Sequence, residues 1–349
     1  MLDYNLVENL PRDQWNAFLE KFSFGNFEQL FEYGDITRKA FSRTNVLRLA
    51  CFDRDKIVGI LQGIYQKYFG LGSTLEVKHG PVVNLNDVNS VQIVKFFLDA
   101  LENHAKSEHI YGARILVPQE WQIDDAFRLK GYAFGGWLNE YIVNLENGVD
   151  WLWKHISHNK RKNIKKGLTA GVEVFESREK EDLLTFYSML RAAEERAGFK
   201  SYPLSWFETI LNVCPEFSRI FLARWNGKNV SGVFIIMHCK TVFALAAGSL
   251  TEGWKVRSND VMHWKVMEWA SQRGYLKYHM GFVTEPPPME GSPSWGIWRW
   301  KKEWNGNLEK LKIYQKFFHT KYKLIFKVGR FAEKSYDRLR TLKSRIFVS

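Results

Sequence analysis

Two internal segments of the chain concentrate positively charged side chains that could bind anionic substrates. Five of the seven residues from Lys160 to Lys166 are Lys or Arg, and Arg299, Lys301 and Lys302 alternate with tryptophans in the segment 295–306. Such clusters attract phosphates, nucleic acid or an anionic lipid surface. Each also has a structural interpretation: a solvated helix face for the first cluster, and long side chains covering a tryptophan-rich core helix for the second.

Other catalytic patterns do not occur in the sequence. There is no P-loop, no GxSxG nucleophile elbow, and no HxxxH or CxxC metal set. Cys51, Cys214 and Cys239 are too dispersed for a disulfide framework, which favours a reducing cytoplasm. His279 could titrate near neutrality, although a lone histidine at a strand end is more often structural. We therefore expect neither a metal nor a serine or cysteine nucleophile.

Two similar sets of helices and strands must position these side chains. Their order predicts an α/β (α+β) fold. The first half is expected to contain a strand hairpin, an amphipathic helix, a strand, a helix and a last strand (46–52, 57–65, 91–105, 113–117, 121–130 and 137–145). The second half repeats this order. It is expected to contain a hairpin at 219–225 and 230–238, strands at 242–248, 275–281 and 308–315, and helices at 258–273 and near 298. The hairpins CFDRDKIVGIL and ARWNGKNVSGVF match, with Gly59 and Gly232 at similar points. We infer a tandem duplication.

The length of 349 residues predicts about two domains. We place the first at 1–148, the second at 149–317, and a basic helical tail at 318–349. From Lys310 onward there are 12 Lys or Arg against only Glu333 and Asp337. Such a tail is either a docking helix with a solvated basic face, or a contact for tRNA or an anionic membrane. No signal peptide is evident, and no apolar run approaches the ~18 residues of a spanning helix.

The segment from Trp137 to Val174 resembles a known family. Its strand, the pair Trp151 and Trp153, the basic run and the GVEV ending are similar to the start of the second half of the FemABX-type aminoacyltransferases, the peptidoglycan bridge-forming peptidyltransferases. These enzymes consist of two tandem acetyltransferase-like (GNAT) units. The resemblance implies two tandem GNAT-like domains in the short form that lacks a coiled-coil arm, with a C-terminal helix that returns to the first domain.

The segment from Trp295 to Gly306 is similar to the family motif G-h-x-x-F-K-x-x-F-G, with Trp300 at the aromatic position and Lys301 at the lysine. The resemblance implies a catalytic role for Lys301 in acyl transfer. An amine that attacks an aminoacyl ester builds negative charge on the carbonyl oxygen and on the leaving oxygen, and a buried cation lowers that barrier by a few kcal/mol. No side-chain base is evident, so the amine is expected to lose its proton to a substrate phosphate or to water.

Two strand ends also resemble the family, with departures. Gly248 lies in AAGS, where Ala246 stands at the usual tyrosine position, and Gly281 ends YHMG, where His279 stands at an acidic position. The resemblance implies that Gly248, Gly281 and Trp300 lie in the substrate site. The departures leave the identity of the substrate open.

Family members bind the diphosphate of their precursor with basic side chains. The lysine position here holds Thr37 and the arginine position holds Tyr202, so neighbouring cations are the substitutes. The resemblance gives as substrate-binding residues Tyr33, Arg38, Lys39, Lys200 and Tyr202. Either the acceptor differs from the usual precursor or its phosphate contacts are rearranged. Lys160, Arg161 and Lys165 are further candidates for phosphate or tRNA backbone.

A coenzyme A cradle, R/Q-x-x-G-x-G/A before a helix, is not found; the nearest match, Lys67 to Gly72, continues into a strand-like segment. We therefore expect no cofactor. The predicted function is transfer of an amino acid from aminoacyl-tRNA to an amine of a nucleotide- or lipid-linked sugar-peptide in cell-wall synthesis, by a monomer that is cytoplasmic or peripheral at the inner face of the membrane. The alternatives are an acyl-CoA-dependent N-acyltransferase of surface polysaccharide or lipid assembly, and a non-catalytic RNA-binding module.

Overall fold

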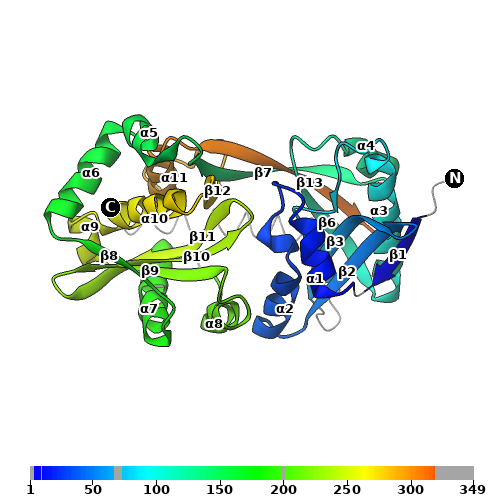
Figure 1. Cartoon of the computed structure of the whole chain (residues 1–349), viewed down its shortest axis with the longest axis horizontal. Helices are drawn as coiled ribbons and strands as arrows, with labels where there is room; N and C mark the ends of the chain where they lie inside the picture. The colour runs from blue at the N-terminus through cyan, green and yellow to red at the C-terminus, as the bar shows by residue number, and fades with distance from the viewer. Residues whose placement is uncertain (1–3, 9, 67–72, 199–200, 319–349) are drawn as a thin grey trace, which may run out of the picture.

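The computed structural model describes residues 4–8, 10–66, 73–198 and 201–318 (Figure 1). Lys200 and, apart from Phe318, the predicted C-terminal helical tail lie outside the described residues. The strands and helices of the first half are β1 (Tyr4–Glu8), α1 (Arg12–Leu19), the 3-10 helix η1 (Phe27–Gln29), α2 (Phe31–Ala40), β2 (Thr44–Asp53), β3 (Lys56–Gln66), β4 (Ser73–Lys78), β5 (Val82–Val83), α3 (Ser90–Ser107), β6 (Ile110–Pro118), α4 (Asp124–Leu129) and β7 (Ala133–Asn144).

The second half repeats the strand order that the sequence predicts. Its elements are α5 (Gly148–His155), α6 (His158–Thr169), β8 (Glu173–Ser177), α7 (Lys180–Ala197), α8 (Leu204–Val213), β9 (Ser218–Trp225), β10 (Lys228–His238), β11 (Thr241–Ser249), α9 (Thr251–Lys255), α10 (Ser258–Gln272), β12 (Lys277–Val283), α11 (Pro293–Lys302) and β13 (Asn307–Phe317). The β9–β10 hairpin turns at Asn226 and Gly227, whose φ angles of +49° and +76° are those that a two-residue hairpin turn requires.

The strands form one continuous 13-stranded sheet across both halves, in the order β1-β2-β3-β4-β6-β13-β7-β12-β11-β10-β9-β8, with β5 paired to β3. Each half contributes an antiparallel run that ends in a parallel pair, β4–β6 in one half and β11–β12 in the other. The repeated arrangement confirms the tandem organisation that the element order predicts.

Strands β7 and β13 join the halves. β13 is antiparallel to β6 on one side and to β7 on the other, and β7 also pairs with β12. Figure 1 shows these two long strands crossing from one lobe to the other. The last strand of each half therefore lies beside the strands of the other half. The division at residues 148 and 149 remains a prediction.

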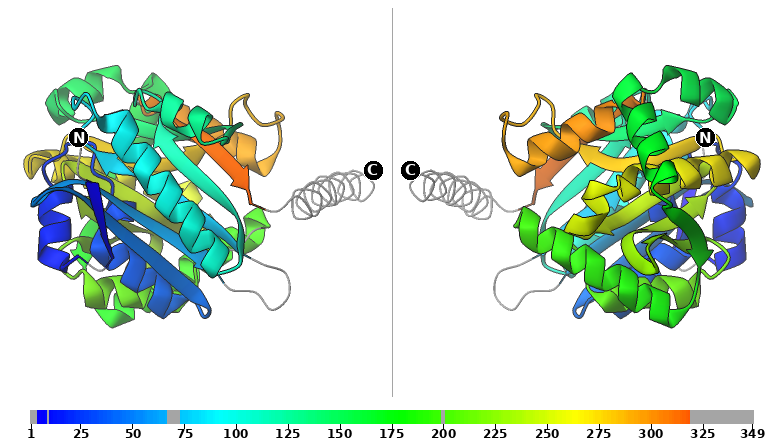
Figure 2. Two further views of the ribbon diagram at one scale, coloured as in Figure 1. Left: turned by 90° about the vertical axis from the view of Figure 1, so that its right-hand side faces the viewer. Right: turned by 90° about the vertical axis from the view of Figure 1, so that its left-hand side faces the viewer.

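Three large apolar clusters stabilise this arrangement. One packs α3 and α4 on the sheet of the first half, and a second packs α5, α6 and α10 on the sheet of the second half. The third is shared: Trp15 and Leu30 of the first half belong to the same cluster as Phe186 and Trp206 of the second. The views in Figure 2 show the helices lying on both faces of the sheet. Burial of apolar surface therefore holds the two halves together as well as each half.

Candidate functional site

A cavity of about 1010 Å³ lies at the junction of the two halves. The first half lines it with residues of η1, of the end of β4 and of β7, including Glu28, His79 and Glu140. The second half lines it with α7, β11, the start of α10, the end of β12 and α11. A cleft of this size with a few polar groups among apolar walls is the usual form of a small-molecule site.

The sheet opens at this cavity. β11 pairs with β12 at only three positions, from Thr241 to Phe243, although β11 continues to Ser249. The corresponding strands of the first half, β4 and β6, pair along the whole of β4. The two parallel strands of the second half therefore diverge, and the residues of β11 beyond Phe243 line the cavity. The second half alone has this notch among the described residues, which makes it the candidate catalytic half.

Lys301 projects from α11 into this cavity beside the end of β12. Its Nζ donates a 2.8 Å hydrogen bond to the carbonyl of Phe282 and lies 3.7 Å from the position that a Cβ on Gly281 would occupy. The residue is only 9% exposed, and burial lowers the pKa of Lys301 to about 8. No carboxylate pairs with it in the described part of the chain. Lys301 is thus a buried ammonium, still mainly charged at neutral pH, that faces an open space.

A second buried lysine lies close by and has the opposite character. The Nζ of Lys160 is 2.6 Å from Asp260 and 3.3 Å from Glu303, and it stands 4.7 Å from the ring centroids of both Trp300 and Trp304. Its side chain is fully buried. The ammonium is therefore satisfied inside the fold and is not available to a phosphate at the surface, contrary to what the basic run predicts for this residue.

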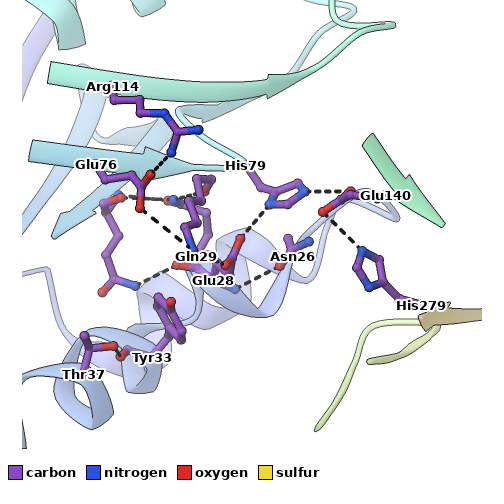
Figure 3. Close-up of polar contacts among 12 residues, drawn as sticks. Asn26, Glu28, Gln29, Tyr33, Thr37, Glu76, His79, Arg114, Glu140 and His279 are labelled. Atoms are coloured by element: carbon purple, nitrogen blue, oxygen red, sulfur yellow. Dashed lines mark hydrogen bonds and ion pairs between the residues drawn. The ribbon is translucent and has the colours of Figure 1, made fainter. Parts of the chain in front are cut away.

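A chain of carboxylates and imidazoles that line the cavity crosses the junction between the halves (Figure 3). His79 Nδ1 lies 2.9 Å from Glu28, and His79 Nε2 lies 3.3 Å from Glu140. The second oxygen of Glu140 lies 3.2 Å from His279 Nε2. Lys78 completes the chain with a 3.1 Å contact to Glu28. These side chains come from η1, from the end of β4, from β7 and from β12, so the chain connects both halves.

The charges in this chain can be assigned from its contacts. Burial opposes ionisation of His79, but the carboxylates of Glu140 and Glu28 outweigh it and raise the pKa of His79 to about 10. Burial likewise opposes ionisation of Glu140, yet its pKa is lowered because His79 and His279 face it. His279 Nδ1 accepts a 3.1 Å hydrogen bond from the backbone N–H of Gly281, and its Nε2 lies 3.2 Å from Glu140.

Several residues predicted from the resemblance do line the cavity: Tyr33, Tyr202, Gly248, Gly281, Trp300 and Lys301. Tyr202 stacks on Trp206 with ring centroids 3.9 Å apart. Trp300 donates a 2.6 Å hydrogen bond to Asp260, and so links Lys301's helix to Lys160. Gly248 is required because a Cβ there would lie 2.4 Å from the backbone nitrogen of Leu190 in α7.

Other predicted residues lie elsewhere. Arg38 and Lys39 are exposed at the end of α2, outside the cavity lining, and Arg38 contacts Asp35 at 3.4 Å. Arg161 donates to the carbonyls of Trp153 and Lys154 at the C-terminal end of α5, where it caps the helix. Lys165 is exposed on α6. Arg38 and Lys39 thus do not replace the missing phosphate-binding cations within the cavity.

The sequence did not indicate Glu28, Lys78, His79 or Glu140, although all four line the cavity. Apart from Lys78 and His79, these residues are distant from one another along the chain, so no local pattern in the sequence groups them. Within the described residues there is no group of three or more His, Cys, Asp or Glu arranged to hold a metal ion. No helix among them is long and apolar enough to cross a membrane.

Comparison with known proteins agrees with this geometry. Residues 154–302 match the acetyltransferase (GNAT) domain family, and this range contains the notch and Lys301. The chain is 24% identical to lipid II:glycine glycyltransferase of Staphylococcus aureus over 241 residues, 63% of this chain and 55% of that protein. It therefore spans about half the length of the curated relatives it matches. A solved structure of FemX superposes with a TM-score of 0.80 at 18% identity, covering 92% of this chain and 99% of that one.

The FemABX resemblance is confirmed. Two further structures share the fold. A tandem GNAT protein from the clavulanic acid biosynthesis pathway has a TM-score of 0.61 at 10% identity, covering 91% of this chain and 99% of that one. L-PGS from Bacillus licheniformis has a TM-score of 0.59 at 14% identity, covering 92% of this chain and 96% of that one. The tandem GNAT-like fold that the FemABX resemblance implies is thereby confirmed as well. These relatives support the prediction of an acyltransferase.

Proposed function

We propose that the chain is an aminoacyltransferase that passes an amino acid from aminoacyl-tRNA to an amine of a cell-wall peptide precursor. The observation that carries the proposal is the buried Lys301 ammonium, which has no carboxylate partner among the described residues and faces a 1010 Å³ cavity. The glycyltransferase named among the relatives acts, by its name, on lipid II. A lipid-linked acceptor would place the enzyme in the cytoplasm, at the inner face of the membrane.

The proposed step needs only groups that the cavity and the substrates supply. The amine nitrogen attacks the ester carbonyl, and a C–N bond forms while an oxyanion develops. Collapse of this intermediate breaks the C–O bond to the ribose, and the surplus proton of the nitrogen leaves to the ribose oxygen or to water. A preorganised cation in a desolvated site stabilises both developing oxygens without reorganisation. Lys301 would supply that cation. This role would account for its burial, because burying an unpaired ammonium group is costly.

The test is transfer from radiolabelled aminoacyl-tRNA pools to nucleotide- and lipid-linked peptide precursors. Lys301→Met, which keeps the chain length and removes the charge, should lower kcat/KM by about 100-fold or more, in line with the loss of one oxyanion donor. Lys302→Met is the matched control on the same helix, because Lys302 already pairs with Glu285 at 3.4 Å. Equal activity of both variants would contradict the proposed role of Lys301.

The same assay separates the alternatives. Transfer from acyl-coenzyme A, with none from aminoacyl-tRNA, would favour the acyl-CoA-dependent N-acyltransferase. RNA binding without any transfer, and without an effect of Lys301→Met, would favour the non-catalytic module. Sedimentation of the active protein checks the proposed monomer.

A further inference from the structure

A smaller pocket of about 350 Å³ adjoins the cavity, and most of its lining belongs to the first half. The two spaces share part of their lining, including Glu28, Lys78 and Tyr202. Strands β3 and β4 and helix α2 line the smaller pocket from the first half, and Tyr202 and Trp206 line it from the second. Its volume lies within the range of small-molecule sites. We call it the side pocket.

The charges of the side pocket do not favour a phosphate. Among the described residues, Lys78 is the only cation that lines it, whereas Glu28 and Glu76 contribute two carboxylates. The Nζ of Lys78 lies 3.1 Å from Glu28 and 4.0 Å from Glu76, so its charge is already compensated. Figure 3 shows Arg114 paired with Glu76, and this arginine lies outside the lining. An anion in the side pocket would face two carboxylates, and such a like-charge contact is strongly unfavourable.

The other polar groups of the side pocket suit a neutral ligand that carries hydroxyls. Tyr33, Thr74 and Tyr202 line it, and within the described part of the chain their hydroxyls have no hydrogen-bond partner. Each of these groups can donate one hydrogen bond and accept others, as a sugar hydroxyl can, and a carboxylate such as Glu76 can accept from a sugar hydroxyl. The lining therefore offers both donors and acceptors without a net positive charge.

The aromatic walls are held in place by neighbouring rings. Tyr202 stacks on Trp206 with centroids 3.9 Å apart and an interplanar angle of 12°, and Tyr33 packs edge-on against Phe27 at 5.5 Å and 87°. Fixed side chains lose little conformational freedom when a ligand binds. A sugar ring carries C–H groups on its faces and hydroxyls on its rim, so it can pack against these rings while its hydroxyls reach the polar groups.

We propose that the side pocket binds a neutral sugar ring of the acceptor and that the diphosphate of the precursor lies outside it. The peptide stem would extend from the sugar into the cavity, where its amine meets Lys301. This inference rests on the proposed function for the identity of the acceptor. It departs from what the FemABX resemblance implies, which is that basic side chains at the positions of Thr37 and Tyr202 hold the diphosphate. Both positions line the side pocket, and here neither is charged.

The test is equilibrium binding of three probes, which does not depend on turnover. They are a nucleotide-linked sugar-peptide, the same sugar-peptide with a hydroxyl in place of the nucleotide diphosphate, and the peptide alone. Removal of the nucleotide diphosphate should weaken binding less than about threefold. Removal of the sugar should weaken it by about tenfold or more, the equivalent of one or two hydrogen bonds. Inorganic pyrophosphate should not displace the sugar-peptide.

Tyr202→Phe removes one hydroxyl of the side pocket and keeps the ring that stacks on Trp206. It should weaken binding of both sugar-containing probes by about 3–10-fold and leave binding of the peptide alone unchanged. Tyr187→Phe is the matched control, because Tyr187 is a half-buried tyrosine of α7 that packs on Phe207 and lies outside both linings. It should bind every probe as the wild type does.

The inference is overturned if the wild type binds no probe, if removal of the diphosphate abolishes binding, or if the peptide alone binds as tightly as the sugar-peptide. Equal binding of the sugar-peptide by Tyr202→Phe and Tyr187→Phe would also overturn it. Aminoacyl transfer to the nucleotide-linked precursor alongside any of these results would leave the proposed function intact. Tight, sugar-dependent binding without transfer to any precursor would support the inference and contradict the proposed function.

Discussion

At the scale of single residues, two lysines of similar burial show how partners decide a role. Lys160 is fully buried and has two carboxylates and two indoles around its ammonium. Lys301 is almost as deeply buried, but has one backbone carbonyl. An uncompensated buried charge is costly, so a neutral side chain at this position would stabilise the fold at least as well as Lys301 does. This contrast, and not the sequence motif alone, is the physical argument for a catalytic Lys301.

The titration of Lys301 predicts how the rate depends on pH. Because burial lowers the pKa of Lys301 to about 8, the charged form dominates below that pH and is lost as the pH rises through it. We therefore expect kcat/KM to fall on the alkaline side with an apparent pKa near 8. Arginine does not titrate in this range, so Lys301→Arg, if active, should move the fall to higher pH. A fall at the same pH in both proteins would assign it to another group.

At the scale of elements, Glu140 of β7 connects the first half to β12 through His79 and His279. Glu140→Gln leaves the buried His79 cation with only Glu28, so we expect a loss of about 3 kcal/mol in the free energy of unfolding. The control is Glu309→Gln: Glu309 lies opposite Glu140 in the β7–β13 ladder, but its pair with Lys277 is about 40% exposed. That variant should lose less than about 1 kcal/mol. Urea titration of both variants measures the difference.

The effect of Glu140→Gln should itself depend on pH. The pKa of His79 is raised to about 10 from 6.5, so its contribution is complete below pH 6.5 and is lost as the pH rises toward 10. The pKa of Glu140 is lowered from 4.5, so its contribution is present above that pH and is lost on acidification. The difference in stability between wild type and variant should therefore be largest near pH 5 to 7. A constant difference from pH 5 to 10 would exclude this ionic interpretation.

The packing of α7 against β11 gives a second prediction at this scale. A Cβ at Gly248 would lie 2.4 Å from the backbone nitrogen of Leu190, which cannot move without shifting α7. Gly248→Ala should therefore destabilise the protein by about 1–3 kcal/mol or more, as overpacking does. Gly296 of α11 has no atom within 4 Å of the same position, so Gly296→Ala should be neutral or stabilising by up to ~1 kcal/mol. Thermal unfolding distinguishes the two, and equal melting temperatures would contradict the contact.

At the scale of the whole molecule, the two halves depend on each other because β7 pairs with β12 of the second half and β13 pairs with β6 of the first. Without residues 149–349, β6 and β7 would lose β13 from between them, and the shared apolar cluster would lose Phe186 and Trp206. Residues 1–148 expressed alone should therefore aggregate, because they expose strand edges and apolar surface. Co-expression with residues 149–349 should restore a soluble complex on size-exclusion chromatography. A soluble, cooperatively folding 1–148 fragment would show that the first half is an independent domain.

The sequence by itself determined the repeated elements and the lysine at the site. Hydrophobic periodicity and turn residues are local signals, so they located α3, the β9–β10 hairpin and β13 to within a few residues. The resemblance of the tryptophan-flanked segment to a family motif indicated Lys301, and that motif is local because it lies along one helix. The exposure of the basic side chains was less predictable. The basic run predicts a charged surface, but the packing of α6 against α10 buries Lys160 against Asp260.

Only the tertiary structure decided what surrounds Lys301. Glu28, His79 and Glu140 belong to η1, to the end of β4 and to β7, and no local pattern indicates that they meet. The divergence of β11 from β12 and the pairing of β13 between β6 and β7 are likewise relations between distant strands. Ionisation and binding depend on which groups burial brings together, and that is fixed by long-range pairing and packing, which the order of residues specifies only through the complete fold.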